Sequence, residues 1–269
     1  PPIGDFCLSV PIRTLALQPE RGGVRAGELG VGAGIVYDSE ASDEYAECQL
    51  KARFLTGLEN QFEVFETIRA SREEGCRQRD LHLARMAASA RYFGMPFDAG
   101  AAGAALDDAC AAFAPAQHYR LRLALGEAGR LSVTSVPLTA LAEPVGLLLA
   151  QDATDADALF ARHKTSIRSR YDDAWRAAEQ QGGFDTLFFN QRGELTEGGR
   201  SNVFVKFAGR WITPPLACGV LPGIMRAEVL ATPAWAASEA VVTRAMLEHA
   251  DEIIVCNALR GPLRAYLMQ

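Results

Sequence analysis

The chain has 269 residues, 49% of them hydrophobic and 22% charged, which is the balance of a globular protein with room for two packed units. Its net charge of −6 offers no basic field for nucleic acid, and its longest apolar runs, such as 145–150, are too short to span a bilayer. The six cysteines form no CxxC pair and have no histidine at ligand spacing, which argues against a structural zinc site and indicates reduced thiols in the cytoplasm. No signal peptide is visible, and because the chain begins with Pro1 we expect it to be part of a longer protein.

Residues 1–58 differ in pattern from the rest of the chain. They offer a strand-like run over 6–17, a glycine-rich stretch over 30–34 and an acidic helix over 43–55. About sixty residues of this kind are marginal as an independent core. We therefore expect an extension or a fragment of another domain.

Residues 59–151 alternate predicted strands with predicted helices. Asp80 is expected to cap a helix whose apolar residues recur at helical spacing and which Gly94 ends. A second helix is expected over 101–113. The expected strands cover 62–69, the two arms of a hairpin at 119–125 and 130–136, and 145–150.

A second lobe is predicted over 152–269, and its first six residues, 152–157, are polar and form the expected linker. Its first helix is marked by apolar and aromatic residues over 167–178 and stops at Gly182, and another helix opens at 220–224. The expected strands cover 186–189, 201–207, 211–213 and finally 252–256. The sequence thus predicts a mixed α and β class in two lobes.

Two residues suggest chemistry of one kind. Lys164 is one of three lysines against many arginines; a lysine can form an imine with an aldehyde cofactor, and burial lowers its pKa so that the neutral amine is available. Glu197 lies in a glycine-rich turn just before a strand, where a carboxylate could hold the protonated ring nitrogen of pyridoxal 5'-phosphate (PLP), the electron sink of that cofactor. Taken singly, each position is better explained by a surface lysine and by an ordinary turn glutamate.

Two further features could hold an anion. The segment 221–226 puts Gly223 at a loop-to-helix junction, where free backbone N–H groups and the helix dipole suit a phosphate. His82 and Arg85 lie three residues apart on one helix face, and Arg85 could clamp a phosphate bidentately. Each feature is weak alone, since many helices begin with Pro-Gly and most arginines on helices are solvated. The sequence holds no G-x-S-x-G, P-loop or H-E-x-x-H motif.

In chain order, these features belong to a set of six motifs. The motifs are 65–69 (Phe-Glu-Thr-Ile-Arg), His82-x-x-Arg85, 163–165 (His-Lys-Thr), 196–204 (Thr-Glu-Gly-x-x-Ser-Asn-Val-Phe), 221–226 (Leu-Pro-Gly-Ile-Met-Arg) and 256–259 (Cys-Asn-Ala-Leu). In this order they resemble fold-type-IV PLP enzymes, which include branched-chain and D-amino-acid aminotransferases and aminodeoxychorismate lyases. The resemblance covers about residues 62–269, and the last two motifs resemble the lyases more than the aminotransferases.

The resemblance implies an α+β fold with a small N-terminal α/β lobe (59–151) and a larger PLP-binding lobe (152–269). It implies that Lys164 forms the Schiff base with PLP and that Glu197 partners the pyridine nitrogen. The implied phosphate contacts come from Arg85, from the backbone of Ile224 and Met225, and from the turn of Asn257 and Ala258.

Residues 1–58 resemble the last segment of chorismate-binding enzymes, with aminodeoxychorismate synthase component I nearest among them. The resemblance rests on 10–15, 32–36, 38–39 and 44–51. It implies that Arg13 held a substrate carboxylate, that Glu47 ligated magnesium and that Lys51 lay beside the site. Because most of that domain is missing, we expect these roles to be vestigial and expect no metal to bind. The lyase-like part also begins abruptly at Phe62, without the strands that usually precede its first motif.

A synthase end directly before a lyase is the arrangement of fusions that make 4-aminobenzoate for folate. The implied reaction converts 4-amino-4-deoxychorismate to 4-aminobenzoate and pyruvate, with the freed Lys164 amine as general base and acid and Thr67 as candidate proton donor to the departing enolpyruvyl group. The resemblance further implies a homodimer, a cytoplasmic location and, for the full fusion, a glutamine amidotransferase partner. The alternatives are a fold-type-IV aminotransferase and a non-catalytic partner domain of the synthase.

Overall fold

The computed structural model describes residues 14–19, 25–32, 34–56 and 62–268. The chain divides into two compact units, Pro1–Asn60 and Gln61–Gln269. Residues 6–13 of the strand expected over 6–17, and with them Arg13, lie outside the described residues.

The described part of the first unit holds a two-stranded ribbon and one helix. β1 (Thr14–Leu17) pairs antiparallel with β2 (Gly27–Gly30), and α1 spans Ala41–Thr56, close to the helix predicted over 43–55. Large apolar side chains here are exposed, Leu17 by 53% and Tyr45 by 67%. These described residues therefore bury little apolar surface within their own unit, as expected for so short a segment.

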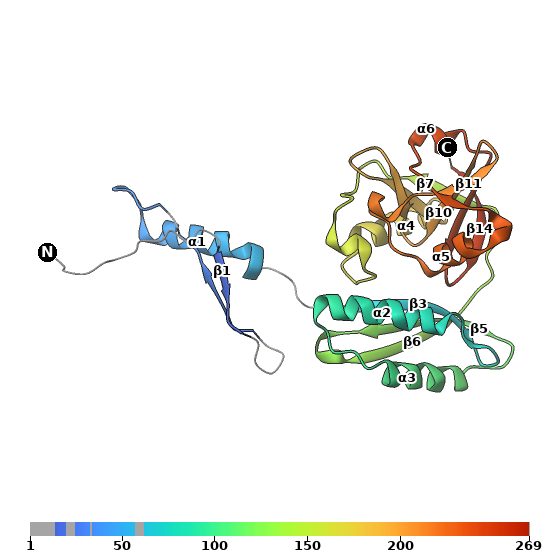
Figure 1. The fold of residues 1–269 in the computed structure, drawn as a ribbon, viewed down its shortest axis with the longest axis horizontal. Helices are drawn as coiled ribbons and strands as arrows, with labels where there is room; N and C mark the ends of the chain where they lie inside the picture. Colours follow the sequence, from blue (N-terminus) through green and yellow to red (C-terminus); the bar gives the residue numbers. More distant parts are fainter. Residues whose placement is uncertain (1–13, 20–24, 33, 57–61, 269) are drawn as a thin grey trace. The chain divides into compact units, whose positions relative to one another are not determined.

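The second unit begins with a four-stranded antiparallel sheet in the order β4-β3-β5-β6 (Figure 1). The strands are β3 (Val64–Ser71), β4 (Gly75–Cys76), β5 (His118–Leu125) and β6 (Leu131–Pro137). Alternate residues of β3 and β5 share one core with α2 (Arg79–Phe93) and α3 (Ala99–Ala111). Because side chains alternate along a strand, the opposite face of the sheet carries Phe65, Thr67 and Arg69.

The start of α2 differs from the prediction. Gln78 is the N-cap residue, with a φ of 54°, and Asp80 lies inside the first turn instead of capping the helix. The Gln78 side chain donates to the carboxylate of Glu228 on α5 (Ile224–Ala231), so a tertiary contact fixes the residue at which α2 begins. Gly94 ends the helix in the left-handed conformation, with a φ of 68°, as predicted.

The larger lobe is built on an eight-stranded mixed sheet in the order β12-β11-β10-β13-β14-β7-β8-β9. The strands are β7 (Val145–Leu149), β8 (Asp185–Phe189), β9 (Leu195–Gly198), β10 (Asn202–Phe207), β11 (Arg210–Thr213), β12 (Ser238–Glu239), β13 (Glu252–Asn257) and β14 (Gly261–Leu267). The helices are α4 (Ser169–Gln180), α5 and α6 (Arg244–Glu248). One buried cluster fills the centre of the lobe, and a second, which includes Phe204 and Met225, lies between α5 and the sheet.

Three strands of this sheet are not predicted by the sequence pattern: the two-residue strand β12, and the longer β9 and β14. β9 contains Glu197, which the pattern places in a turn, and β14 follows the segment 252–256, which the pattern makes the last strand. β9 is short and ends in glycine, and β14 includes Pro262, so intrinsic strand preference is weak in both. Pairing with β8 and with β13 forms these strands in the folded chain.

The segment around Lys164 joins the two lobes of the second unit. An isolated antiparallel bridge links Val64 to Thr165. The Phe65 N–H donates to the Lys164 carbonyl at 2.9 Å, and the Ser166 N–H donates to the Glu63 carbonyl at 2.8 Å. The backbone of Lys164 is thus tied to the first strand of the small sheet, far earlier in the sequence.

Candidate active site

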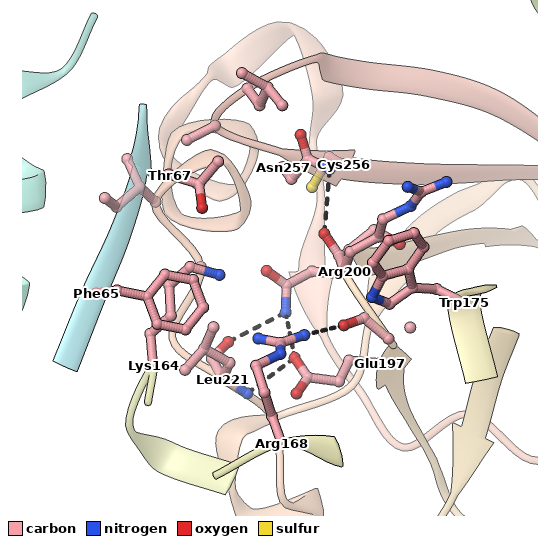
Figure 2. Close-up of a pocket in the computed structure, with 18 of the residues that line it drawn as sticks. Phe65, Thr67, Lys164, Arg168, Trp175, Glu197, Arg200, Leu221, Cys256 and Asn257 are labelled. Carbon is pink, nitrogen blue, oxygen red and sulfur yellow. Dashed lines mark hydrogen bonds between the residues drawn. The ribbon is translucent and has the colours of Figure 1, made fainter. Parts of the chain in front are cut away.

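A cavity of about 220 Å³ lies between the outer face of the small sheet and the larger lobe (Figure 2). The predicted site residues that line it are Thr67, Arg85, Lys164, Glu197, Ile224, Asn257 and Ala258. Met225 does not line it, because its side chain is 2% exposed and packs with Phe204 and Val229. Motifs spread over most of the second unit therefore meet in one place, and Met225 can offer the cavity only its backbone.

Lys164 presents its amine to the cavity beside an aromatic ring. Its Nζ atom lies 4.8 Å from the centre of the Phe65 ring. Burial first, and then the nearby charges of Arg168 and Arg85, lower the pKa of Lys164 to about 7 against the opposing charges of two carboxylates, Glu66 and Glu197. A large fraction of the amine is therefore neutral near pH 7 and available as a nucleophile or base.

Glu197 faces the same cavity from β9 and is only 7% exposed. Its Oε2 atom accepts hydrogen bonds from the Leu221 N–H at 3.0 Å and from Asn202 Nδ2 at 3.1 Å. Its Oε1 atom has no hydrogen-bond donor within the described part of the chain. Burial raises the pKa of Glu197 to about 8, although the Leu221 hydrogen bond and the charges of Arg168 and Lys164 oppose that rise. A cationic donor at the free oxygen would favour the ionised carboxylate.

The N-terminus of α5 forms another wall of the cavity. Gly223 is the N-cap residue and supplies no side-chain cap, so the first N–H groups of the helix stay free of such a partner. A Cβ atom at Gly223 would overlap Asn202 Oδ1, so only glycine fits this close approach. At the neighbouring end of β13, Asn257 Oδ1 accepts from the Arg260 N–H at 2.8 Å and shapes the turn that contains Ala258.

Arg85 reaches the cavity wall but is bound by a buried carboxylate. Arg85 Nε donates to Glu66 Oε1 at 2.8 Å, Nη2 donates to Glu66 Oε2 at 2.6 Å, and Nη1 donates to the Pro222 carbonyl at 3.0 Å. His82 is fully buried and shares Glu66 Oε2 through Nδ1 at 2.7 Å. Burial acts to raise the pKa of Glu66, but Arg85 and His82 hold it at about 2. His82 therefore helps to hold the Glu66 carboxylate in place, and of His82 and Arg85 only Arg85 lines the cavity.

Thr67 lies on the outer face of β3, and its side chain points toward the cavity (Figure 2). Glu47 lies in the other unit, where it pairs with Lys51 at 2.7 Å on α1. Within the described ranges, no group of three or more His, Cys, Asp and Glu side chains could hold a metal ion. No helix in these same ranges has the length and apolar character needed to cross a membrane.

Some residues of the cavity wall were not assigned a role from the sequence. They are Arg120, Arg168, Trp175, Asn202 and Leu221. Asn202 and Leu221 fall inside predicted motifs, but their contact with Glu197 depends on how two loops pack. Arg168 follows Lys164 by four residues, and this short separation could have indicated that Arg168 also lines the cavity.

The sequence matches two known protein families, one in each unit of the chain. Residues 63–265 match the model of the amino-transferase class IV family. The chain belongs to the amino-transferase class IV family. Residues 2–57 of this class IV protein match the model of chorismate binding enzymes. The fold is that of fold-type-IV enzymes, and members of the family depend on PLP.

Relatives of this class IV protein carry names of two kinds. A provisionally named aminodeoxychorismate lyase from Schizosaccharomyces pombe is 27% identical over 154 residues, which are 55% of this chain and 67% of the relative. A provisionally named amino-acid aminotransferase from Mesorhizobium loti is 36% identical with a TM-score of 0.70, over 77% of this chain and 100% of that one. A provisionally named 4-amino-4-deoxychorismate lyase from Legionella pneumophila is 25% identical with a TM-score of 0.67, over 76% and 82% of the two chains. The family is thus established, and the relatives span both lyases and aminotransferases.

Proposed function

We propose that this chain binds PLP through Lys164 and converts 4-amino-4-deoxychorismate to 4-aminobenzoate and pyruvate. The observation that carries the proposal is a lysine with a pKa of about 7 facing one cavity together with a buried glutamate that keeps one oxygen free. The choice of the lyase reaction within the family is supported by the chorismate-binding match at residues 2–57, directly before the class IV match.

The residues around the cavity fit PLP in three respects. Lys164 supplies a largely neutral amine for the aldehyde carbon, and the free Oε1 of Glu197 supplies an acceptor for a protonated ring nitrogen. The uncapped N-terminus of α5, which begins at Ile224, suits a phosphate, with the turn of Asn257 and Ala258 beside it. Arg85 lies at this end of the cavity, because its guanidinium, paired with Glu66, also bonds the Pro222 carbonyl just before α5.

PLP, when bound, would draw electrons from the carbon that carries the substrate amine. Lys164 would then accept the proton from that ring carbon, because its amine is neutral near pH 7 once it is displaced by the substrate. Glu197 would keep the ring nitrogen protonated. Thr67, on the outer face of β3, would donate a proton to the enolpyruvyl group as its carbon–oxygen bond breaks. Loss of pyruvate leaves an aromatic ring, which drives the reaction.

Two arginines on the small sheet support an anionic substrate. Arg69 and Arg120 are cross-strand partners on the outer face, and neither has a carboxylate partner among the described residues. Like charges placed directly opposite each other destabilise a sheet, so the pair favours an anion between them. Arg120 lines the cavity, and the proposed substrate carries carboxylates that could meet this charge.

The deciding assay is incubation with 4-amino-4-deoxychorismate in the absence of any amino acceptor. We expect release of pyruvate and 4-aminobenzoate in equal amounts, and no release by Lys164→Ala. The name of the Mesorhizobium loti neighbour favours a second candidate, an aminotransferase. In that case turnover would require a keto acid, and pyruvate would not be released from aminodeoxychorismate alone. A chain that binds no PLP would instead be a non-catalytic partner of a synthase.

We further propose a domain organisation, an assembly and a location for the chain. We assign residues 1–58 to the C-terminal part of a chorismate-binding domain, in which Glu47 pairs with Lys51. The predicted lobes 59–151 and 152–269 need one change, because β7 pairs with β14 and β8 in the larger sheet and therefore belongs to the larger lobe. A homodimer, a cytoplasmic location and a glutamine amidotransferase partner of the full fusion complete the proposal.

A further inference from the structure

Arg168 lies in the cavity wall without an evident role in binding or chemistry. It sits four residues after Lys164, just before α4, and its side chain is 16% exposed. Its Nε atom donates to Asp172 Oδ1 at 2.9 Å, and Nη2 donates to the Gly199 carbonyl. The same Asp172 oxygen accepts from Trp175 Nε1 at 3.1 Å, so the carboxylate that holds Arg168 is itself held. The guanidinium is therefore fixed in place at the cavity, as Figure 2 shows.

The position of this guanidinium relative to the two reactive groups is unusual. Arg168 lies near enough to Glu197 and Lys164 to influence both charges, yet it forms no ion pair with Glu197 within 4.0 Å in the described part of the chain. Asp172 and the Gly199 carbonyl occupy its donors instead. A freely moving arginine would pair with the buried carboxylate and block its free oxygen. The tether keeps that oxygen open toward the cavity.

The other charged groups that face Lys164 come from three elements. Glu66 on β3 is bound by Arg85 and His82, Glu197 on β9 is buried, and Arg85 on α2 is bound by Glu66. The charges of Glu66 and Arg85 therefore offset each other through direct contact. Arg168 is left as the cation that acts on Lys164 and on Glu197 together.

We propose that Arg168 is a positioning residue whose tethered guanidinium favours the neutral form of the Lys164 amine and the ionised form of the Glu197 carboxylate without contacting either. A positive charge at this place opposes a proton on Lys164 and opposes a proton on Glu197. In agreement with this geometry, Arg168 lowers the pKa of Lys164 and also lowers the pKa of Glu197. The inference rests on the proposed cofactor role of Lys164, because that role needs both protonation states at once.

The first test is a pH titration of the visible absorbance of the imine between Lys164 and PLP in the holoenzyme. In Arg168→Gln we expect the midpoint to rise by about one pH unit or more, since a fixed neighbouring cation is lost. Arg168→Lys should recover part of the shift. The matched control is Arg162→Gln, which removes an exposed positive charge two residues before Lys164 and outside the cavity wall, and should keep the wild-type midpoint. An unchanged or lowered midpoint in Arg168→Gln would overturn the inference.

A second measurement needs no bound cofactor. The apoprotein is treated with limiting acetic anhydride over a pH series, and acetylation of Lys164 is quantified by peptide mass spectrometry. Lys206, which is half-buried and pairs with Glu252, serves as internal reference. We expect Lys164 to react at lower pH than Lys206 in the wild type and to move toward Lys206 in Arg168→Gln. The same Lys164 profile in both proteins would refute the role of Arg168. Absence of an imine in the wild type, with the acetylation shift intact, would count against the proposed cofactor role instead.

Discussion

Replacement of Glu197 by glutamine is the sharpest test of the proposed ring-nitrogen partner. Glutamine is nearly isosteric, and its amide oxygen can still accept from the Leu221 N–H and from Asn202 Nδ2. Its NH₂ group then takes the position of the free Oε1 atom and faces the cavity with a donor where an acceptor stood. The fold should persist, while the site loses the charge that would keep a pyridine nitrogen protonated.

The size of the effect follows from the burial of this carboxylate. Two unit charges about 3 Å apart attract by about 5 kcal/mol at an effective dielectric constant of about 20. The amide keeps part of that interaction as a dipole, so we expect a loss of about 3 kcal/mol in transition-state stabilisation. That loss corresponds to a fall in turnover of at least about a hundredfold.

The assay is steady-state pyruvate release, with PLP content measured on the same samples. Glu248→Gln is the matched control, because Glu248 lies on α6, is exposed and does not line the cavity. Near-normal turnover in Glu197→Gln with full PLP content would refute the assigned role. A loss of turnover that came only with a loss of PLP would show that Glu197 holds the cofactor without tuning it.

Four further outcomes are expected. Borohydride reduction of the holoenzyme should fix PLP to the peptide that contains Lys164, and label on another lysine would reject the site. Glu66→Gln should cost about 3 kcal/mol in urea unfolding because it strands the half-buried Arg85 and the buried His82, whereas a loss below about 1 kcal/mol would contradict the network. In the apoprotein, the raised pKa of Glu197 means that the folded state binds more protons than the unfolded state between pH 4.5 and about 8, so the stabilisation from this proton is lost as pH rises. The free energy of unfolding of the wild type should therefore fall relative to that of Glu197→Gln from pH 4.5 to about pH 8, and parallel curves would refute this. The chain alone should not aminate chorismate with magnesium and ammonia, and detection of aminodeoxychorismate would restore a function to residues 1–58.

The organisation of the chain could be predicted from local sequence. Helix α2 ends at Gly94 because only a residue that tolerates a positive φ continues there without strain. The alternation in 119–125 predicts β5, since a strand with one buried face needs a period of two. The short strand β9 and the proline-containing β14 were missed, because their stability comes from neighbouring strands that are distant in the sequence or follow a tight turn.

The residues of the candidate site could also be named from ordered motifs, but their burial, their partners and their protonation could not. A motif places a lysine at 164 and a glutamate at 197, and it leaves open whether either is buried. Only the folded chain shows that Arg85 is bound by Glu66 and that Met225 turns away from the cavity. Charge and pKa depend on which groups lie within a few ångströms and on how much water is excluded. Those distances arise when β3 pairs with the Lys164 segment, and the sequence by itself carries no signal for that pairing.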